Sequence, residues 1–168
     1  MDMKNRISFG TVRSVVLMLS FAVAATGVAS AYAQRDLGEP FFQESGLITK
    51  QIETGPGEMQ ISFSANGTFK DNIEITNNGD FVSISKGDNL TFGQGQGVIT
   101  SGDGSETANY TFIGVGNVTE EGKPVFHGAA AYSTNSTGEL SFLNNILGIF
   151  NVEIDQTGSF VSNEWKWN

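Results

Sequence analysis

His127 is the only histidine in the chain and carries its most distinctive chemistry. An imidazole titrates near neutral pH, so it can act as a general base or donate a hydrogen bond to a ligand carbonyl. No acidic partner can be assigned to it, and the alternative is an interior or rim histidine with satisfied hydrogen bonds. Tyr110 offers a hydroxyl that orients a ligand, against the alternative of a core tyrosine bonded to backbone.

Metal and phosphate chemistry find little support. The chain has no cysteine and one histidine, which excludes thiol chemistry and leaves too few ligands for zinc or copper. Asp103–Glu106 and Asp155–Gly158 resemble calcium loops, but they lack the full set of alternating oxygen ligands and lie where hairpins need turns. Gly93, Gly95 and Gly97 precede no helix, so they form no phosphate loop. The sequence predicts no metal and no cofactor, and it identifies no catalytic residue.

Tyr110 belongs to a long predicted β-hairpin over Leu90–Asn117. Two alternating runs flank Asp103-Gly104, a dipeptide typical of a tight type I′ turn. This turn would place Gly97 opposite Tyr110. Glycines across from aromatic side chains let rings lie over bare backbone and let strands bend, which favours a closed barrel over a flat sheet.

The remaining chain alternates with a period of two and carries turn signals about every dozen residues. Asn78-Gly79 predicts a tight turn between a strand near Ile73 and Ile75 and another at Phe81–Ser85. Apolar spacings of three and four in Leu140–Phe150 predict a short helical turn that plugs one barrel mouth, with a strand entering at Gly148 as the alternative. The predicted fold is all-β: a single antiparallel up-and-down barrel of about eight strands.

Residues opposite each other in a ladder share a face, so the inner face can be followed from strand to strand. This predicts a bulky wall made of Ile73, Ile75, Val82, Ile84, Phe150, Val152 and Trp165. The opposite wall is bare and consists of Gly93, Gly95, Gly97, Gly114, Gly116, Ala129 and Ala131. A barrel of this size either fills itself with side chains or holds one small ligand. The predicted ligand contacts are Tyr110, Phe112, His127, Ala131 and Trp165.

The same reasoning predicts a contiguous apolar stripe on the outer face, formed by Leu90, Phe92, Ile113, Val115, Phe126 and Tyr132. Such a stripe on a secreted protein usually has a cover or a partner. The Phe41-Phe42 pair or a second copy of the barrel would supply it. A homo-oligomer would use the Phe92, Ile113 and Val115 face.

Residues 1–33 form a predicted secretory signal peptide. Three basic residues precede an apolar run from Val15, and Ala31-Tyr32-Ala33 has the small-x-small form of a cleavage site. An uncleaved anchor helix is the alternative. Residues 34–45 form a polar lead-in, in which Phe41-Phe42 is part of a disordered stalk or docks on the barrel, and residues 46–168 form the barrel domain.

Cleavage would remove three of the nine basic residues and one of the 18 acidic ones, which leaves a net charge of −11. This charge argues against nucleic acid and anionic membrane as partners. Because the chain begins with a predicted signal peptide, the expected location is outside the cell or at its surface. Five Asn-x-Ser/Thr sequons are candidate glycosylation sites, at Asn66, Asn89, Asn109, Asn117 and Asn135.

The sequence from Gly95 to Asn168 resembles a family of uncharacterised prokaryotic proteins, some of them archaeal, related in pattern to calycin-like barrels of the allene oxide cyclase kind. The segments that carry this resemblance are G-Q-G-V-I-T-S-G-D-G, F-I-G-V-G, G-K-P-V-F-H-G, L-S-F-L-N-N-I-L-G-I-F-N-V-E-I-D and W-K-W. They consist mainly of turn glycines and core residues. The resemblance implies a small antiparallel barrel and supplies no catalytic residue.

Three functional hypotheses follow. The leading one is a secreted barrel that binds a small apolar or amphipathic molecule in its interior. The second is an enzyme of the cyclase or isomerase type that uses the same cavity. The third is a structural cell-surface module with a filled core and no ligand.

Overall fold

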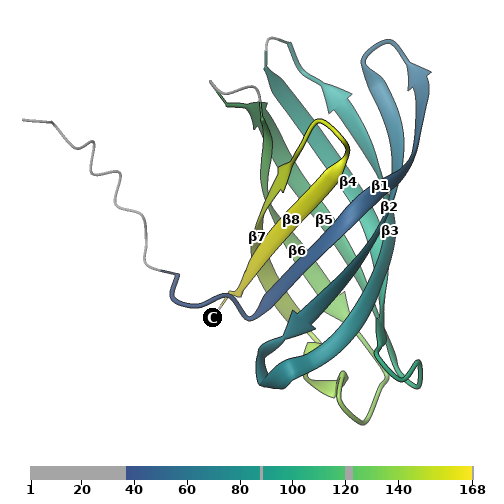
Figure 1. The fold of residues 1–168 in the computed structure, drawn as a ribbon, viewed down its shortest axis with the longest axis vertical. Helices are drawn as coiled ribbons and strands as arrows, with labels where there is room; N and C mark the ends of the chain where they lie inside the picture. Colours follow the sequence, from purple (N-terminus) through teal and green to yellow (C-terminus); the bar gives the residue numbers. More distant parts are fainter. Residues whose placement is uncertain (1–36, 88, 120–122, 168) are drawn as a thin grey trace, which may run out of the picture. The chain divides into compact units, whose positions relative to one another are not determined.

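The computed structural model describes residues 37–87, 89–119 and 123–167, so the predicted signal peptide lies outside the described residues. Eight antiparallel strands close into a barrel, which confirms the predicted fold class (Figure 1). The strands are β1 (Phe42–Gly55), β2 (Glu58–Phe69), β3 (Ile73–Ser85), β4 (Leu90–Ser101), β5 (Thr107–Val118), β6 (Pro124–Ser133), β7 (Ile146–Ile154) and β8 (Ser159–Lys166). Within these ranges, no helix has the length and apolarity needed to cross a membrane.

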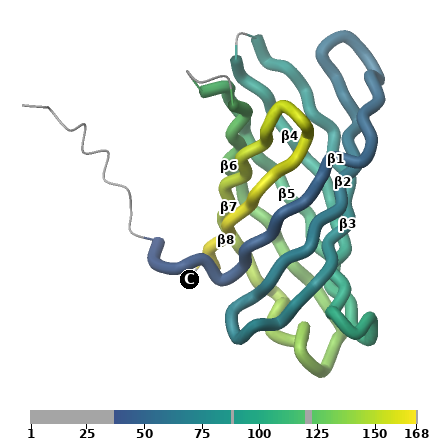
Figure 2. The backbone as a smooth tube through the Cα atoms, viewed as in Figure 1, coloured from purple at the N-terminus to yellow at the C-terminus, as the bar shows by residue number. Residues whose placement is uncertain are grey.

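Each strand pairs with the next along the chain, and β1 pairs with β8 to complete the ring (Figure 2). β1 begins at Phe42, earlier than the predicted start of the barrel domain at Gly46. Of the two alternatives for Phe41-Phe42, the structure has the docked rings, with exposed fractions of 9% and 2%. Phe42 stacks on Phe69 with ring centroids 4.3 Å apart.

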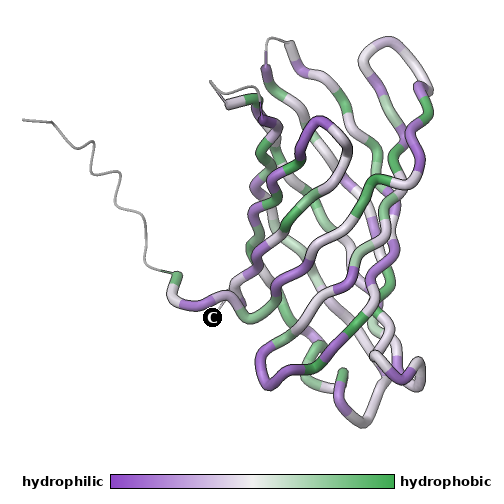
Figure 3. Tube along the Cα trace, viewed as in Figure 1, coloured by the Kyte–Doolittle hydropathy of each residue, from purple (hydrophilic) through white to green (hydrophobic). Residues whose placement is uncertain are grey.

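Apolar and polar residues alternate along the strands (Figure 3), and the tightest part of the core lies at the end of the barrel where β6 connects to β7. That connection contains the single 3₁₀ turn Ser141–Leu143, which confirms the predicted short helical turn. Leu140 and Leu143 are completely buried. The Glu106 carboxylate accepts a hydrogen bond from the Leu140 backbone N–H at 2.7 Å, which ties this plug to the β4–β5 turn.

The central hairpin has the predicted register: Gly97 pairs with Tyr110, Gly95 with Phe112 and Gly93 with Gly114. The turn itself differs from the predicted type I′ turn, because Gly104 is its only residue with positive φ, at 75°. A four-residue loop joins Ser101 to Glu106. In it the Asp103 carboxylate accepts hydrogen bonds from the Ser105 N–H and the Ser101 hydroxyl. These bonds lower the pKa of Asp103 to about 2.

The predicted turn at Asn78-Gly79 is wrong. Both residues lie in the middle of β3, which runs unbroken and pairs with β2 on one side and β4 on the other. A continuous β3 places Ile75, Asn77 and Gly79 on the inner face. Val82 and Ile84 therefore face outward and do not belong to the lining.

The predicted registers of three strand pairs, β3–β4, β5–β6 and β7–β8, are shifted by one residue, and each shift exchanges the two faces of a strand. In the β3–β4 pair, Ile84 lies opposite Phe92, not opposite Thr91 as predicted. In the β5–β6 pair, Phe112 lies opposite Ala130 and Tyr110 opposite Tyr132. Phe126 and Tyr132 therefore face inward, and the face predicted to line the interior is the outer one (His127, Ala129, Ala131 and Ser133). In the β7–β8 pair, Phe150 lies opposite Glu164, not opposite Trp165 as predicted.

The predicted bare wall is largely covered by aromatic rings from neighbouring strands. A Cβ on Gly97 would overlap the Tyr110 ring, and one on Gly116 would overlap the Phe126 ring. Gly93 is different, because its nearest such neighbour is Phe81 Cδ2 at 3.8 Å. Glycine at Gly97 and Gly116 makes room for a ring, and at Gly93 it leaves space.

We expect Gly97→Ala to lower the free energy of unfolding by about 1–3 kcal/mol, because the new methyl group must displace the Tyr110 ring. Gly93→Ala, on the same strand and the same face, is the matched control and should change stability little. Urea denaturation of both variants measures the difference. Equal losses would show that strand propensity, and not the ring contact, determines the effect.

Candidate functional site

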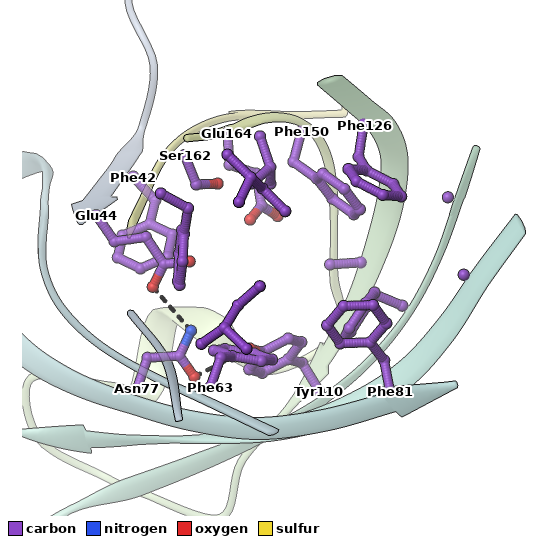
Figure 4. A pocket seen from close by; sticks show the side chains of 18 of the residues that line it. Phe42, Glu44, Phe63, Asn77, Phe81, Tyr110, Phe126, Phe150, Ser162 and Glu164 are labelled. Atoms are coloured by element: carbon purple, nitrogen blue, oxygen red, sulfur yellow. Dashed lines mark hydrogen bonds between the residues drawn. The ribbon is translucent and has the colours of Figure 1, made fainter. Parts of the chain in front are cut away.

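The interior of the barrel contains a cavity of about 90 Å³. Its lining is mostly apolar and includes seven phenylalanines: Phe42, Phe63, Phe81, Phe112, Phe126, Phe150 and Phe160. Figure 4 shows Phe63 and Phe81 on one side of this space and Phe126 and Phe150 on the opposite side. Around this apolar space the structure places a small group of polar side chains, which are the candidate functional residues.

Two of these polar residues are glutamates on the strands that close the barrel. In the β1–β8 pair, Glu44 lies opposite Ser162 and Phe42 lies opposite Glu164. Paired positions share a face, and the buried Phe42 identifies that face as the interior. Both carboxyl groups therefore line the cavity, one from each strand (Figure 4).

A chain of hydrogen bonds connects Glu44 to β3 and β5. Glu44 Oε2 accepts a hydrogen bond from Asn77 Nδ2 at 2.8 Å, and Asn77 Oδ1 accepts one from the Tyr110 hydroxyl at 2.9 Å (Figure 4). Asn77 is 1% exposed, so its amide depends on these partners. The amide orientation is consistent in both bonds, since nitrogen donates and oxygen accepts.

Glu164 is more buried and less satisfied than Glu44. Its exposed fraction is 4%. Oε2 accepts a 2.7 Å hydrogen bond from the Tyr132 hydroxyl, whereas the buried Oε1 has no hydrogen-bond partner among the described residues. A Cβ on Gly148 would overlap Oε1, so the glycine makes room for this carboxyl.

The environment shifts the protonation of these groups. Burial raises the pKa of Glu44 to about 7, and the Asn77 hydrogen bond offsets part of that shift. Burial raises the pKa of Glu164 to about 8, with a further increase from the neighbouring charge of Glu44. The pKa values of Tyr110 and Tyr132 are raised mainly by burial, so both phenols remain protonated.

This arrangement keeps two carboxylic acids substantially protonated near neutral pH beside an apolar space. Such a group can donate a proton, accept a hydrogen bond, or pair with a cation after ionising. Among the described residues, no Lys, Arg or His lines the cavity. The same residues contain no group of three or more His, Cys, Asp or Glu side chains arranged to hold a metal ion.

The structure brings two of the five predicted ligand contacts to the cavity, Tyr110 and Phe112. His127 and Ala131 are exposed on the outer face of β6. Trp165 also lies on the outer face, where its indole N–H donates to the Gly38 carbonyl at 2.9 Å. The five sequon asparagines are all exposed.

Sequence reasoning missed Glu44, Asn77 and Glu164. Acidic residues in strands normally face solvent, and the shifted β7–β8 register placed Glu164 outside. A signal was nevertheless present, because the alternating pattern of the last strand also fits the register in which Phe160, Ser162 and Glu164 face inward. Shifting the predicted β7–β8 register by one residue would have placed all three side chains inside.

We expect the free energy of unfolding to fall as pH rises from about 4.5 to about 8. The folded pKa values of both glutamates lie above the ordinary value of 4.5, so the native state binds more protons than the unfolded state in this range. The loss should be on the order of a few kcal/mol, because each pKa unit corresponds to about 1.4 kcal/mol. Urea denaturation at a series of pH values measures it.

The double variant Glu44→Gln/Glu164→Gln should flatten this dependence. Glu153→Gln, which removes an exposed carboxylate from the outer face of β7, is the control and should retain it. A pH dependence that persists unchanged in the double variant would contradict the assignment.

Three solved bacterial structures have this fold at low sequence identity. A protein with unknown function from Clostridium acetobutylicum superposes with a TM-score of 0.61 and 14% identity, over 76% of this chain and 96% of that chain. A conserved protein of unknown function from Rhodopseudomonas palustris has a TM-score of 0.61 and 13% identity, over 76% and 95%. A beta-barrel like protein from Acinetobacter baumannii has a TM-score of 0.61 and 14% identity, over 76% and 93%.

At these identities the likeness shows the fold alone. No family model matches this chain, and no curated protein matches it. The chain is thus similar to uncharacterised β-barrel-like bacterial proteins, and its function must be inferred from its own interior.

Proposed function

We propose that this protein is a binding barrel that holds a small apolar or amphipathic molecule in its interior. The observation that carries the proposal is a cavity that combines an aromatic lining with a buried carboxyl oxygen lacking a partner. Small-molecule sites are typically concave and mostly apolar, with a few polar groups that fix orientation. A structural module with a filled core accounts for neither the cavity nor the unpartnered oxygen.

A second candidate function is a cyclase or isomerase, in keeping with the resemblance to calycin-like barrels of the allene oxide cyclase kind. It is favoured by one observation, the raised pKa of Glu164 at about 8, together with the Tyr132 hydroxyl on the same carboxyl. A carboxylic acid kept protonated in an apolar site is a competent general acid. Turnover of a bound unsaturated substrate, lost in Glu164→Gln while binding persists, would distinguish this function from simple binding.

The proposed setting is outside the cell or at its surface, after removal of residues 1–33.

Self-association through the outer apolar face is proposed as well. In the structure this face contains Phe92, which is half-buried, and the exposed Leu90, Ile113 and Val115. Phe41 and Phe42 do not cover it, because their rings pack on Phe69 and Tyr132 in the core.

We expect Gly93→Leu to abolish ligand binding with little loss of stability. The new side chain enters the cavity without a close contact at its Cβ. Ligand-detected NMR with a panel of small alcohols, hydrocarbons and amines measures binding. Gln96→Leu adds the same side chain on the outer face of β4 and should bind as the unmodified protein does. Binding that survives Gly93→Leu would place the ligand outside the cavity.

We expect Ile113→Asp to dissociate any oligomer, because it places a charge in the centre of the outer apolar face. Ile113 is 57% exposed in the single chain. Light scattering on purified protein gives the subunit count. Leu47→Asp, at a 54% exposed position on β1, is the control and should leave the count unchanged. An unmodified protein that is monomeric at high concentration would refute the proposal.

A further inference from the structure

The unpartnered oxygen of Glu164 defines the polar end of the cavity. Oε2 is occupied by the Tyr132 hydroxyl at 2.7 Å, and Oε1 is buried without a hydrogen-bond partner among the described residues. Oε1 itself occupies the space that a Cβ at Gly148 would fill. A donor that enters the cavity would complete the hydrogen bonding of this carboxyl.

The lining side chains that can become charged near neutral pH are both acids. Glu44 faces the same space from β1, and the remaining titratable side chains in the lining are Tyr110 and Tyr132, which are neutral donors. No basic side chain among the described residues lines the cavity to balance the two acids. A ligand that brings a positive charge would compensate the charge that either glutamate acquires on ionising, whereas an anion would oppose that ionisation.

Resting on the proposed binding function, we propose that the ligand is a compact organic amine, bound with its ammonium group on Glu164 Oε1 and its apolar body among the aromatic rings. Ammonium is a three-donor group, so it can satisfy Oε1 and still offer a donor to Glu44. Aromatic faces such as those of Phe112 and Phe150 also attract cations. The carboxyl is already desolvated by the fold, which leaves only the ammonium to lose its water on binding.

The size of the cavity limits the ligand. A dry cavity of about 150 Å³ can hold benzene, and this one has about 90 Å³. The amine should therefore have a body of only a few carbon atoms within the enclosed space. Beyond it, the lining continues along Phe126, Val152 and Ile154 toward the other end of the barrel, where a longer chain would lie.

The test compares three probes of the same length, n-butylamine, 1-butanol and butyrate, by isothermal titration calorimetry. We expect the amine to bind roughly tenfold or more tightly than the alcohol, and butyrate not to bind. Because Glu164 must ionise to pair with ammonium, amine binding near pH 7 should release up to about one proton. Proton release is measured by repeating the titration in buffers of different ionisation enthalpy, and the alcohol should release none.

The amine affinity should also rise with pH between about 6 and about 8.5, because a growing share of the carboxyl is then already ionised while the amine stays charged. This series uses the unmodified protein, so it tests the proposal even if a variant fails to fold. In Glu164→Gln the preference for amine over alcohol and the proton release should both disappear. Glu153→Gln, the exposed control, should keep both.

The outcomes separate the two proposals. If the alcohol binds as tightly as the amine, or if Glu164→Gln keeps the preference, the amine inference is overturned and the binding barrel stands. If none of the three probes binds to the unmodified protein, and no member of the broader panel does, both the amine inference and the binding function are overturned.

Discussion

The pairing of β1 with β8 is the contact on which the rest of the structure depends. It turns a meander of hairpins into a closed barrel and so removes the open edges that an eight-stranded sheet would present. Its register sets Phe42 beside Glu164 and Glu44 beside Ser162. A slip of β1 by one residue against β8 would expose Phe42 and turn the Glu44 carboxyl out to solvent. The same ladder therefore provides closure, part of the core and the polar end of the cavity.

The buried Glu164 carboxyl lowers the stability of the barrel interior. Aromatic rings packed over glycine fill most of the barrel, as where Tyr110 covers Gly97. Glu164 is the exception, since an ionised carboxyl buried without a counter-charge is costly and the group responds with a raised pKa. An apolar side chain at this position would avoid that cost, but it would remove the unpartnered oxygen to which the proposed amine would bind.

Local patterns were sufficient for the architecture and for the elements built around a single turn. The register of the central hairpin was predicted to the residue, because its two alternating runs flank a single turn and its glycines lie opposite aromatic side chains. The plug at Ser141–Leu143 was visible in the spacing of Leu140 and Leu143. Asn78-Gly79 shows the limit of such signals. That dipeptide lies in the middle of β3, where pairing on both sides outweighs its preference for a turn.

The sequence by itself determined the antiparallel meander of strands, the hairpin carrying Tyr110 and Phe112, and the short helical turn, because each depends mainly on contacts between residues close together in the chain. Only the tertiary structure decided which faces of β6 and β8 line the interior. A period-two pattern reads equally well in either of two registers, and a shift of one residue moved His127, Ala131 and Trp165 outside and Glu164 inside. The cavity itself depends on strands far apart in the chain, since its two glutamates are brought together by barrel closure.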